Sequence, residues 1–177
     1  LYLEAPDSLG VEIYIDRPRD AWTFSRGQLV MVTKPLESRR LLAEAGETVW
    51  TGMPAGTTAG HVHLKVSNLD KAKAFYSGHL GMSVTQKNYP GALFFAAGDY
   101  HHHVGTNIWE SKNAPFAPPE EAGLRCFSVI LPSREDLEGL KNRTAQSGLP
   151  MEALPHSDDG FLTRDADHIA VGVEALP

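Results

Sequence analysis

Alternating apolar and polar residues mark the first clear element of this chain at residues 61–66, which read HVHLKV. Strict alternation is typical of a strand with one buried and one open face. Helical spacing follows over residues 69–79, LDKAKAFYSGH, and three further strand-like runs occupy residues 83–88, 92–97 and 101–109. The pattern therefore predicts a module in the order strand, helix, strand, strand, strand.

The same order recurs later in the chain, between residues 125 and 174. Residues 126–132, CFSVILP, have the pattern of a strand, and residues 133–148 that of a helix with a serine cap and a glycine stop. Strands are predicted next near residues 150–154, 160–164 and 168–174. The chain thus contains two copies of one βαβββ module, at residues 60–110 and 124–175.

A third, partial copy opens the chain. LYLEAPDSLGVEI (residues 1–13) aligns without a gap on FLTRDADHIAVGV (161–173), and both segments read as strand, turn, strand. Residues 1–16 are therefore expected to be the closing hairpin of an upstream module that is truncated here. We expect a linker with a short helix at 36–45 in residues 17–59, and a two-module domain in residues 60–177.

Composition narrows the functional classes. The 177 residues carry a formal net charge of -6 and no extended basic patch, which argues against a nucleic-acid partner. The longest apolar run, residues 92–97, is too short to span a membrane, so no membrane association is predicted. The single cysteine, Cys126, suits a reducing compartment, and we expect a cytoplasmic protein.

The repeats separate positions that build the module from positions that carry chemistry. One face of the first strand is apolar in both copies, with Val62, Leu64 and Val66 matched by Phe127, Val129 and Leu131. The opposite face differs, because His61 and His63 correspond to Cys126 and Ser128. The two histidines are therefore not needed to form the fold.

The opening hairpin gives the same result. Tyr2 and Glu12 correspond to Leu162 and Gly172 of the last hairpin, so one copy has functional groups where its sibling has none. Two histidines and one carboxylate on an open face suit Fe(II) that binds both a substrate and O₂. Zinc or manganese can use similar ligands.

The histidines also have simpler interpretations. His61 and His63 point to one side of a strand, so one can bind a metal while the other faces a cavity, or both can lie on a solvated strand face. Three consecutive histidines in a strand, His101, His102 and His103, should place at least one ring on each face. A surface patch that scavenges metal is the alternative for this triplet.

GHVHLKVSNLDKAKAFYSGHLGM, from residue 60, resembles the opening strand and helix of the vicinal oxygen chelate superfamily. That superfamily comprises glyoxalase I, bleomycin-resistance proteins and extradiol ring-cleavage dioxygenases. APDSLGVEIY (5–14) resembles the closing turn and strand of its module. The resemblance covers nearly the whole chain and implies an α+β fold of paired βαβββ modules, the glyoxalase/bleomycin-resistance/dihydroxybiphenyl-dioxygenase fold. Such a fold leaves the function open.

Three segments together, LYLEAP…GVEIYIDRPRDAW, GHVHLKV and GDYHHHVGTNIW, look like the four-module catechol-2,3-dioxygenase-like proteins of bacteria. By this resemblance residues 1–16 end module two, and the two complete copies are module three (60–110) and module four (124–175). The resemblance implies Fe(II) as the cofactor, or Mn(II), held by two histidines and a glutamate. It assigns metal ligands to His61 and Glu12 and places the second histidine ligand upstream of Leu1.

The same resemblance implies a catalytic tyrosine at Tyr2 and an acid/base histidine at His102. His63, His101 and His103 are then expected to bind the substrate, and His101 or His103 takes the acid/base role if the register is off by one. Module four departs from the pattern, since Cys126 and Gly172 stand where a ligating histidine and glutamate are required. The resemblance therefore requires module three to pair with module two.

We expect an extradiol ring-cleaving dioxygenase that acts on a small aromatic diol and O₂, as a homo-oligomer or together with its missing upstream segment. One alternative is a glyoxalase- or isomerase-type metalloenzyme with Zn, Ni or Mn, which favours two carboxylates where only Glu12 is available. The other is a metal-free small-molecule-binding protein like the bleomycin-resistance proteins, which predicts an apolar cup.

Overall fold

The computed structural model describes residues 1–6, 8–116, 118, 120–155 and 157–176. The chain separates into two compact units, Leu1–Gly60 and His61–Pro177. The finer boundaries expected at residues 16 and 59 stay predictions. Within the described ranges, no helix has both the length and the apolar character needed to cross a membrane.

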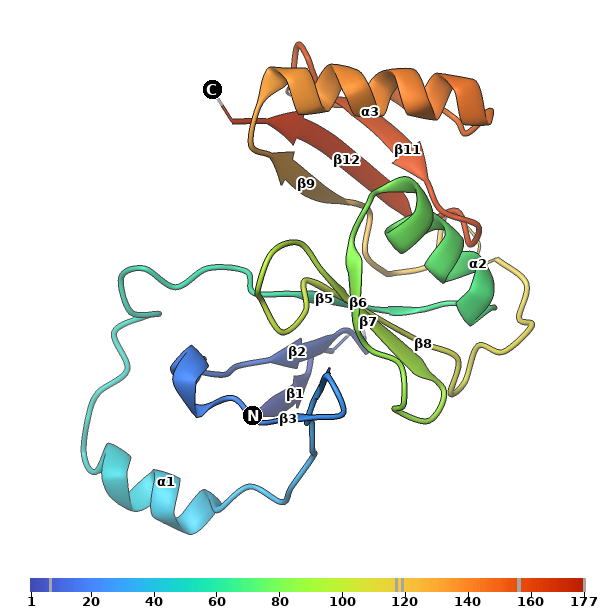
Figure 1. The fold of residues 1–177 in the computed structure, drawn as a ribbon. Coiled ribbons are helices and arrows are strands. Elements are labelled where there is room, and N and C mark those ends of the chain that lie inside the picture. Colours follow the sequence, from blue (N-terminus) through green and yellow to red (C-terminus); the bar gives the residue numbers. More distant parts are fainter. Residues whose placement is uncertain (7, 117, 119, 156, 177) are drawn as a thin grey trace. The chain divides into compact units, whose positions relative to one another are not determined.

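The first unit has one well-formed hairpin and little other regular structure (Figure 1). Strands β1 (Tyr2–Glu4) and β2 (Gly10–Glu12) pair antiparallel, which confirms the predicted strand, turn, strand. The other elements are a 3-10 turn η1 (Arg19–Ala21), the short pair β3 (Phe24–Ser25) and β4 (Gln28–Leu29), and helix α1 (Ser38–Ala45). Helix α1 confirms the short helix predicted at 36–45, although none of its residues is buried.

The described residues of the β1–β2 hairpin share turn features with the hairpin near the end of the chain, as their ungapped alignment predicts. A non-glycine residue is left-handed at the same position of both turns, Ser8 with φ 62° and His168 with φ 63°. The amide of Ser8 donates to the carbonyl of Ala5, and that of His168 to Asp165, at 2.9 and 3.1 Å. The turn therefore forms with different side chains.

Module three forms a four-stranded sheet covered by a helix. Strand β5 (Val62–Lys65) leads into α2 (Leu69–Lys73), which begins after an asparagine cap and continues as a π-helical turn, η2 (Ala74–His79). Strands β6 (Ser83–Gln86), β7 (Ala92–Ala96) and β8 (Val104–Asn107) complete the sheet in the order β5-β8-β7-β6. The first and last strands, β5 and β8, are neighbours and run parallel.

Module four repeats this arrangement (Figure 1). Its elements are β9 (Phe127–Leu131), α3 (Arg134–Ser147), β10 (Glu152–Ala153), β11 (Phe161–Arg164) and β12 (Ala170–Ala175). The sheet order is β10-β11-β12-β9, with β9 and β12 parallel. Ser133 caps α3 and left-handed Gly148 follows its end, so the predicted helix limits are confirmed.

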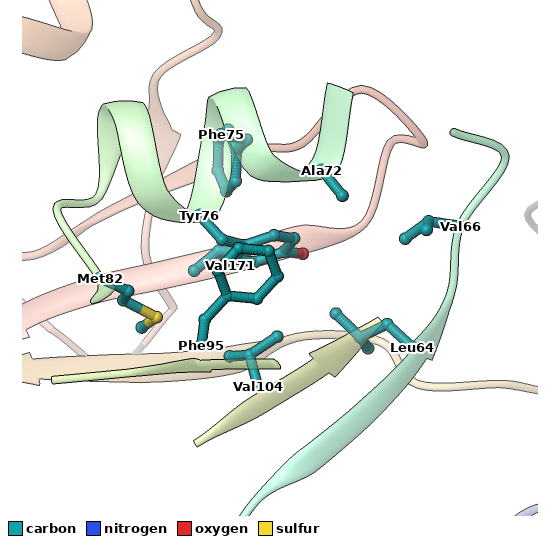
Figure 2. Close-up of a cluster of buried hydrophobic side chains, with 9 residues drawn as sticks. All are labelled: Leu64, Val66, Ala72, Phe75, Tyr76, Met82, Phe95, Val104 and Val171. Atoms are coloured by element: carbon teal, nitrogen blue, oxygen red, sulfur yellow. The ribbon is translucent and has the colours of Figure 1, made fainter. Parts of the chain in front are cut away.

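One hydrophobic core joins the two modules. Val66, Tyr76, Phe95 and Val104 of module three are almost completely buried, and Val171 of β12 packs among them (Figure 2). The face of the first strands predicted to be apolar packs against this core or against the second cluster under α3. The opposite face of β5, with His63 in the strand and His61 directly before it, is left open for other contacts.

A buried hydrogen bond also links the modules. The hydroxyl of Tyr76 in η2 donates to the Asp165 carboxylate at 2.8 Å, and the amides of Asp167 and Ile169 donate to the other carboxylate oxygen. Burial raises the pKa of Asp165 above its ordinary value, while the hydrogen bonds oppose this rise. Burial is also the largest cause of a raised pKa at Tyr76. The hydroxyl therefore stays protonated and remains a donor.

The predicted strand at residues 101–109 is wrong in its first part. Strand β8 begins at Val104, and His101, His102 and His103 lie in an irregular bend before it. Strand alternation therefore does not set the orientation of these three rings. The physical reason is a bulge in β6, described below, that holds the bend.

Candidate functional site

A cluster of imidazole rings lies on the open face of the module three sheet. The ring of His61 lies with its centroid 4.4 Å from that of His102 and 6.1 Å from that of His101. The Nδ1 atoms of His101 and His102 are 2.7 Å apart, so one ring donates a hydrogen to the other. Three histidines from two separate segments of the sequence are thus in contact.

The bend that carries the triplet is held by the neighbouring strand. The pairing of β6 with β7 shifts register between Val84 and Gln86. The hydroxyl of Thr85, at this bulge, donates to the carbonyl of His101 at 2.7 Å. Bulges re-aim side chains beside them. Here the result is that the buried ring of His102 contacts His61 and also Phe94, with ring centroids 4.9 Å apart in the second pair.

The environment keeps His102 neutral. Burial is the largest cause that lowers its pKa, to about 3, and the neighbouring His61, His101, His63 and His103 lower it further in that order. A neutral imidazole can accept a proton or bind a metal, whereas an imidazolium can do neither. His102 is therefore uncharged at neutral pH, with a ring nitrogen that can accept a hydrogen bond or bind a metal.

Aromatic rings border the histidines. His63 contacts Phe94 and Trp109, with ring centroids 5.8 and 5.6 Å away. The ring of Tyr89 in turn lies 5.9 Å from Phe94 and 6.2 Å from Trp109. Together, His61, His63, Phe94, His102 and Trp109 form what we call the histidine–aromatic face.

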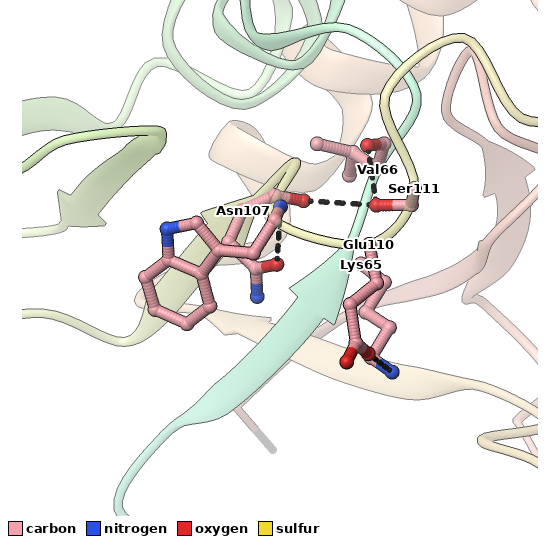
Figure 3. A network of polar contacts seen from close by, with 6 residues as sticks. Lys65, Val66, Asn107, Glu110 and Ser111 are labelled. Atoms are coloured by element: carbon pink, nitrogen blue, oxygen red, sulfur yellow. Dashed lines mark hydrogen bonds and ion pairs between the residues drawn. The ribbon is translucent and has the colours of Figure 1, made fainter.

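The indole of Trp109 is fixed in place although it is half exposed. Its Nε1 donates to the carbonyl of Pro90 at 2.9 Å, and its backbone amide donates to the Asn107 side chain. A Cβ on Gly91 would lie 2.9 Å from the indole, so only glycine allows this close approach. Figure 3 shows the polar contacts beyond it, where Ser111 donates to the carbonyls of Val66 and Asn107.

The first unit brings two other predicted residues together. Tyr2 and Glu12 are directly opposite each other in the β1–β2 ladder. Directly opposite residues of an antiparallel pair project from the same face of the sheet. Tyr2 and Glu12, ten positions apart in the sequence, thus form a cross-strand pair with a hydroxyl and a carboxylate on one face. Both residues are exposed.

Module four fills the corresponding positions with other side chains. Gly172 pairs with Ser128 across the parallel strands, as Gly105 pairs with His63 in module three. A Cβ on Gly172 would lie 2.7 Å from the Ser128 hydroxyl and 2.9 Å from Leu154. A carboxylate has no room there, so module four has no counterpart of the Glu12 side chain at this position.

The predicted site residues therefore fall into separate groups. His61, His101 and His102 are in contact, and His63 lies among aromatic rings. His103 instead accepts a hydrogen bond from the amide of Ala97 at 3.3 Å and packs on Tyr100. In the ranges that the structure describes, no group of three or more His, Cys, Asp or Glu side chains is arranged to hold a metal ion.

Gly105 is a residue that the sequence reasoning missed. A Cβ there would lie 3.2 Å from the His63 ring, so glycine leaves room for that imidazole. The signal was present, because Val104-Gly105 and Val171-Gly172 are the same dipeptide at the same point of each repeat. Tyr89, beside Phe94 and Trp109, was missed because nothing in the sequence shows that the 88–91 turn folds back toward these rings.

Residues 58–171 match the family described as the Glyoxalase/Bleomycin resistance protein/Dioxygenase superfamily. A protein named catechol-2,3-dioxygenase from Bacillus subtilis is 45% identical over 160 residues, which are 89% of this chain and 56% of that protein. The chain therefore spans little more than half of this relative's length.

Solved structures show the same fold. A lactoylglutathione lyase from Agrobacterium tumefaciens has a TM-score of 0.52 at 18% identity, over 68% of this chain and 96% of its own. A glyoxalase/dioxygenase from Nostoc punctiforme has a TM-score of 0.53 at 13% identity, over 73% of this chain and 99% of its own. These similarities confirm the predicted α+β fold of paired βαβββ modules.

Proposed function

Because this chain belongs to the Glyoxalase/Bleomycin resistance protein/Dioxygenase superfamily, we propose that the protein is an extradiol ring-cleaving dioxygenase acting on a catechol-type diol and O₂. The observation that carries the proposal is the contact of His61 with His102 beside Phe94. Imidazoles bordered by aromatic rings suit a flat, oxygen-bearing substrate.

The donor types fit a two-histidine, one-carboxylate iron centre in part. We propose His61 and Glu12 as two ligands, because imidazole and carboxylate are the donors of such centres, and Mn(II) accepts the same set. When bound, Fe(II) supplies a site at which both the diol and O₂ can be activated. The remaining histidine ligand is proposed to come from outside the described residues.

The other residues are proposed to act on protons and on position. His102, uncharged at pH 7, is proposed to accept a hydrogen bond from a diol hydroxyl and so to serve as the acid/base residue of the site. His101, within hydrogen-bond distance of His102, orients that ring or takes the proton onward. Tyr2 donates a hydrogen bond to a substrate oxygen, and His63 with Phe94 positions the ring.

Oxygen uptake with catechol is the decisive experiment, on the protein as its gene encodes it, after anaerobic loading with Fe(II). His61→Ala is expected to abolish uptake and lower bound iron, whereas Cys126→Ala, at the same position of module four, leaves both unchanged. His102→Gln should lower kcat by about 100-fold or more while iron stays bound, as for loss of a general base.

The alternatives give different outcomes. Tight metal binding without oxygen uptake would favour an isomerase-type enzyme, and catechol binding without any metal would favour a small-molecule-binding protein. If Cys126→Ala and His61→Ala lowered uptake equally, the assignment of chemistry to module three would be wrong.

A further inference from the structure

The second unit has a cavity of about 760 Å³ on the side of the sheets opposite to the histidine–aromatic face. Both modules line it, since η2 provides Phe75 and Gly78, α3 provides Arg143, and the turn after β11 provides Asp165. Phe75 also belongs to the core that packs on the other face of β5, which separates this cavity from His61 and His63. Its volume lies in the range of sites for small organic molecules.

Part of the cavity wall is apolar. Ala74, Phe75, Leu149 and Pro150 line it, and the π-helical turn lies at its edge. Turns of π-helix are rare and occur often at functional sites. A Cβ on Gly78 would meet its nearest atom, the Lys73 carbonyl oxygen, only at 4.0 Å, so the space beside this glycine is open.

The charged lining is mainly cationic, in a chain whose net charge is -6. Asp165 and Arg164 already have partners, because Asp165 accepts from Tyr76 and Arg164 binds Glu152 through two nitrogens. Arg143 donates to the His79 carbonyl through Nε at 3.2 Å. Lys71 forms no ion pair within the described residues, so its charge and the outer guanidinium nitrogens of Arg143 remain for a ligand.

We propose that this cavity is a second ligand site, which binds a small organic carboxylate with an aromatic or similar apolar body. Phe75, Leu149 and Pro150 contact the apolar body, and Lys71 and Arg143 bind the carboxylate. This site goes beyond the proposed ring cleavage and does not depend on it. Because both modules line the cavity, the ligand also stabilises their pairing.

The test compares two probes of equal shape, 2-naphthoate and 2-naphthamide, by isothermal titration of the encoded protein. We expect the carboxylate to bind more tightly than the neutral amide. Lys71→Gln should weaken naphthoate binding about three- to fivefold and leave naphthamide unchanged, as for a partly exposed ion pair. Lys73→Gln, in the same helix but outside the cavity lining, is the control and should bind as wild type.

Gly78→Leu fills the cavity and should weaken both probes by about tenfold or more, with an unchanged circular dichroism spectrum. Naphthoate should also raise the Tm of the wild type but not that of this variant. Equal binding of the two probes, or equal losses in Lys71→Gln and Lys73→Gln, would overturn the proposal. So would loss of naphthoate binding in His61→Ala, because that result places the ligand on the histidine–aromatic face.

Discussion

Modules three and four have the same topology and the same parallel pairing of first and last strands, yet among the described residues only module three carries imidazoles on its open face. The comparison is sharpest at one position. Gly105 gives room to the His63 ring, whereas Gly172 lies against Leu154 and Ser128. Glycine at this position therefore lies beside an imidazole ring in module three and beside tightly packed small and aliphatic side chains in module four. The side chains next to the glycine, rather than the backbone, distinguish the two modules.

The largest expected effect tests whether modules three and four share one hydrophobic core although their open faces differ. Phe95 is 0% exposed and packs in the cluster that includes Val171 of module four. Phe95→Ala should lower the free energy of unfolding by about 3–5 kcal/mol. The free energy of opening measured by amide hydrogen exchange should fall by the same amount in β8 and in β12. Ile130→Ala, at a half-exposed site, should cost less than about 1 kcal/mol. A loss confined to β8 would show two independent cores.

The next effect concerns the hydrogen bond between the modules. Tyr76→Phe removes the hydroxyl that donates to Asp165 and leaves a buried carboxylate oxygen without this hydrogen bond. The free energy of unfolding should fall by about 1–3 kcal/mol. Tyr89→Phe is the matched control in module three, because its ring packs beside Phe94 at a partly exposed site. Urea unfolding measures both variants, and equal midpoints would contradict a structural role for the Tyr76 hydroxyl.

The two glycines are expected to tolerate a methyl group differently. Gly172→Ala crowds Leu154 and Ser128 at distances below 3.0 Å and should cost about 1–3 kcal/mol. Gly105→Ala meets the exposed His63 ring at 3.2 Å, and this ring can move away. The second substitution should therefore cost less, which thermal unfolding of the two variants checks. A larger loss in Gly105→Ala would reverse the comparison.

The smallest expected effect is a pH dependence. Burial raises the pKa of Asp165 in the folded protein, so the folded state binds its proton more tightly than the unfolded chain does. The resulting stabilisation is complete below the unfolded pKa and is lost as the pH rises through the raised value. Asp165→Asn removes this dependence. The difference in urea midpoint between wild type and variant should favour the wild type most at acid pH, and an opposite trend would refute the assignment.

Periodicity and capping predicted most of the fold. In the helix predicted at 133–148, Leu137, Leu140 and Thr144 are spaced three and four positions apart, which places them on one side, and all three are buried. Ser133 caps this helix as expected. These features are local, so the sequence contains them. The repeats also identified His61 as an open-face residue by its match to Cys126.

The placement of the histidine triplet could not be predicted in the same way. His102 reaches His61 because the hydroxyl of Thr85 holds the preceding carbonyl, and this contact depends on a register shift between β6 and β7. Strand alternation carries no information about such a shift. The pairing of Tyr2 with Glu12, by contrast, follows from a turn whose length the repeat had already fixed.

The hydrogen bond from Tyr76 to Asp165 also affects how the two modules can be exchanged by recombination. Donor and acceptor lie 89 positions apart and belong to different copies of one duplicated module. A recombination event between the two copies separates them and leaves a buried carboxylate that lacks its donor. An event ahead of both copies keeps them together. Because of this bond, we expect modules three and four to be inherited together, although each has the complete βαβββ topology.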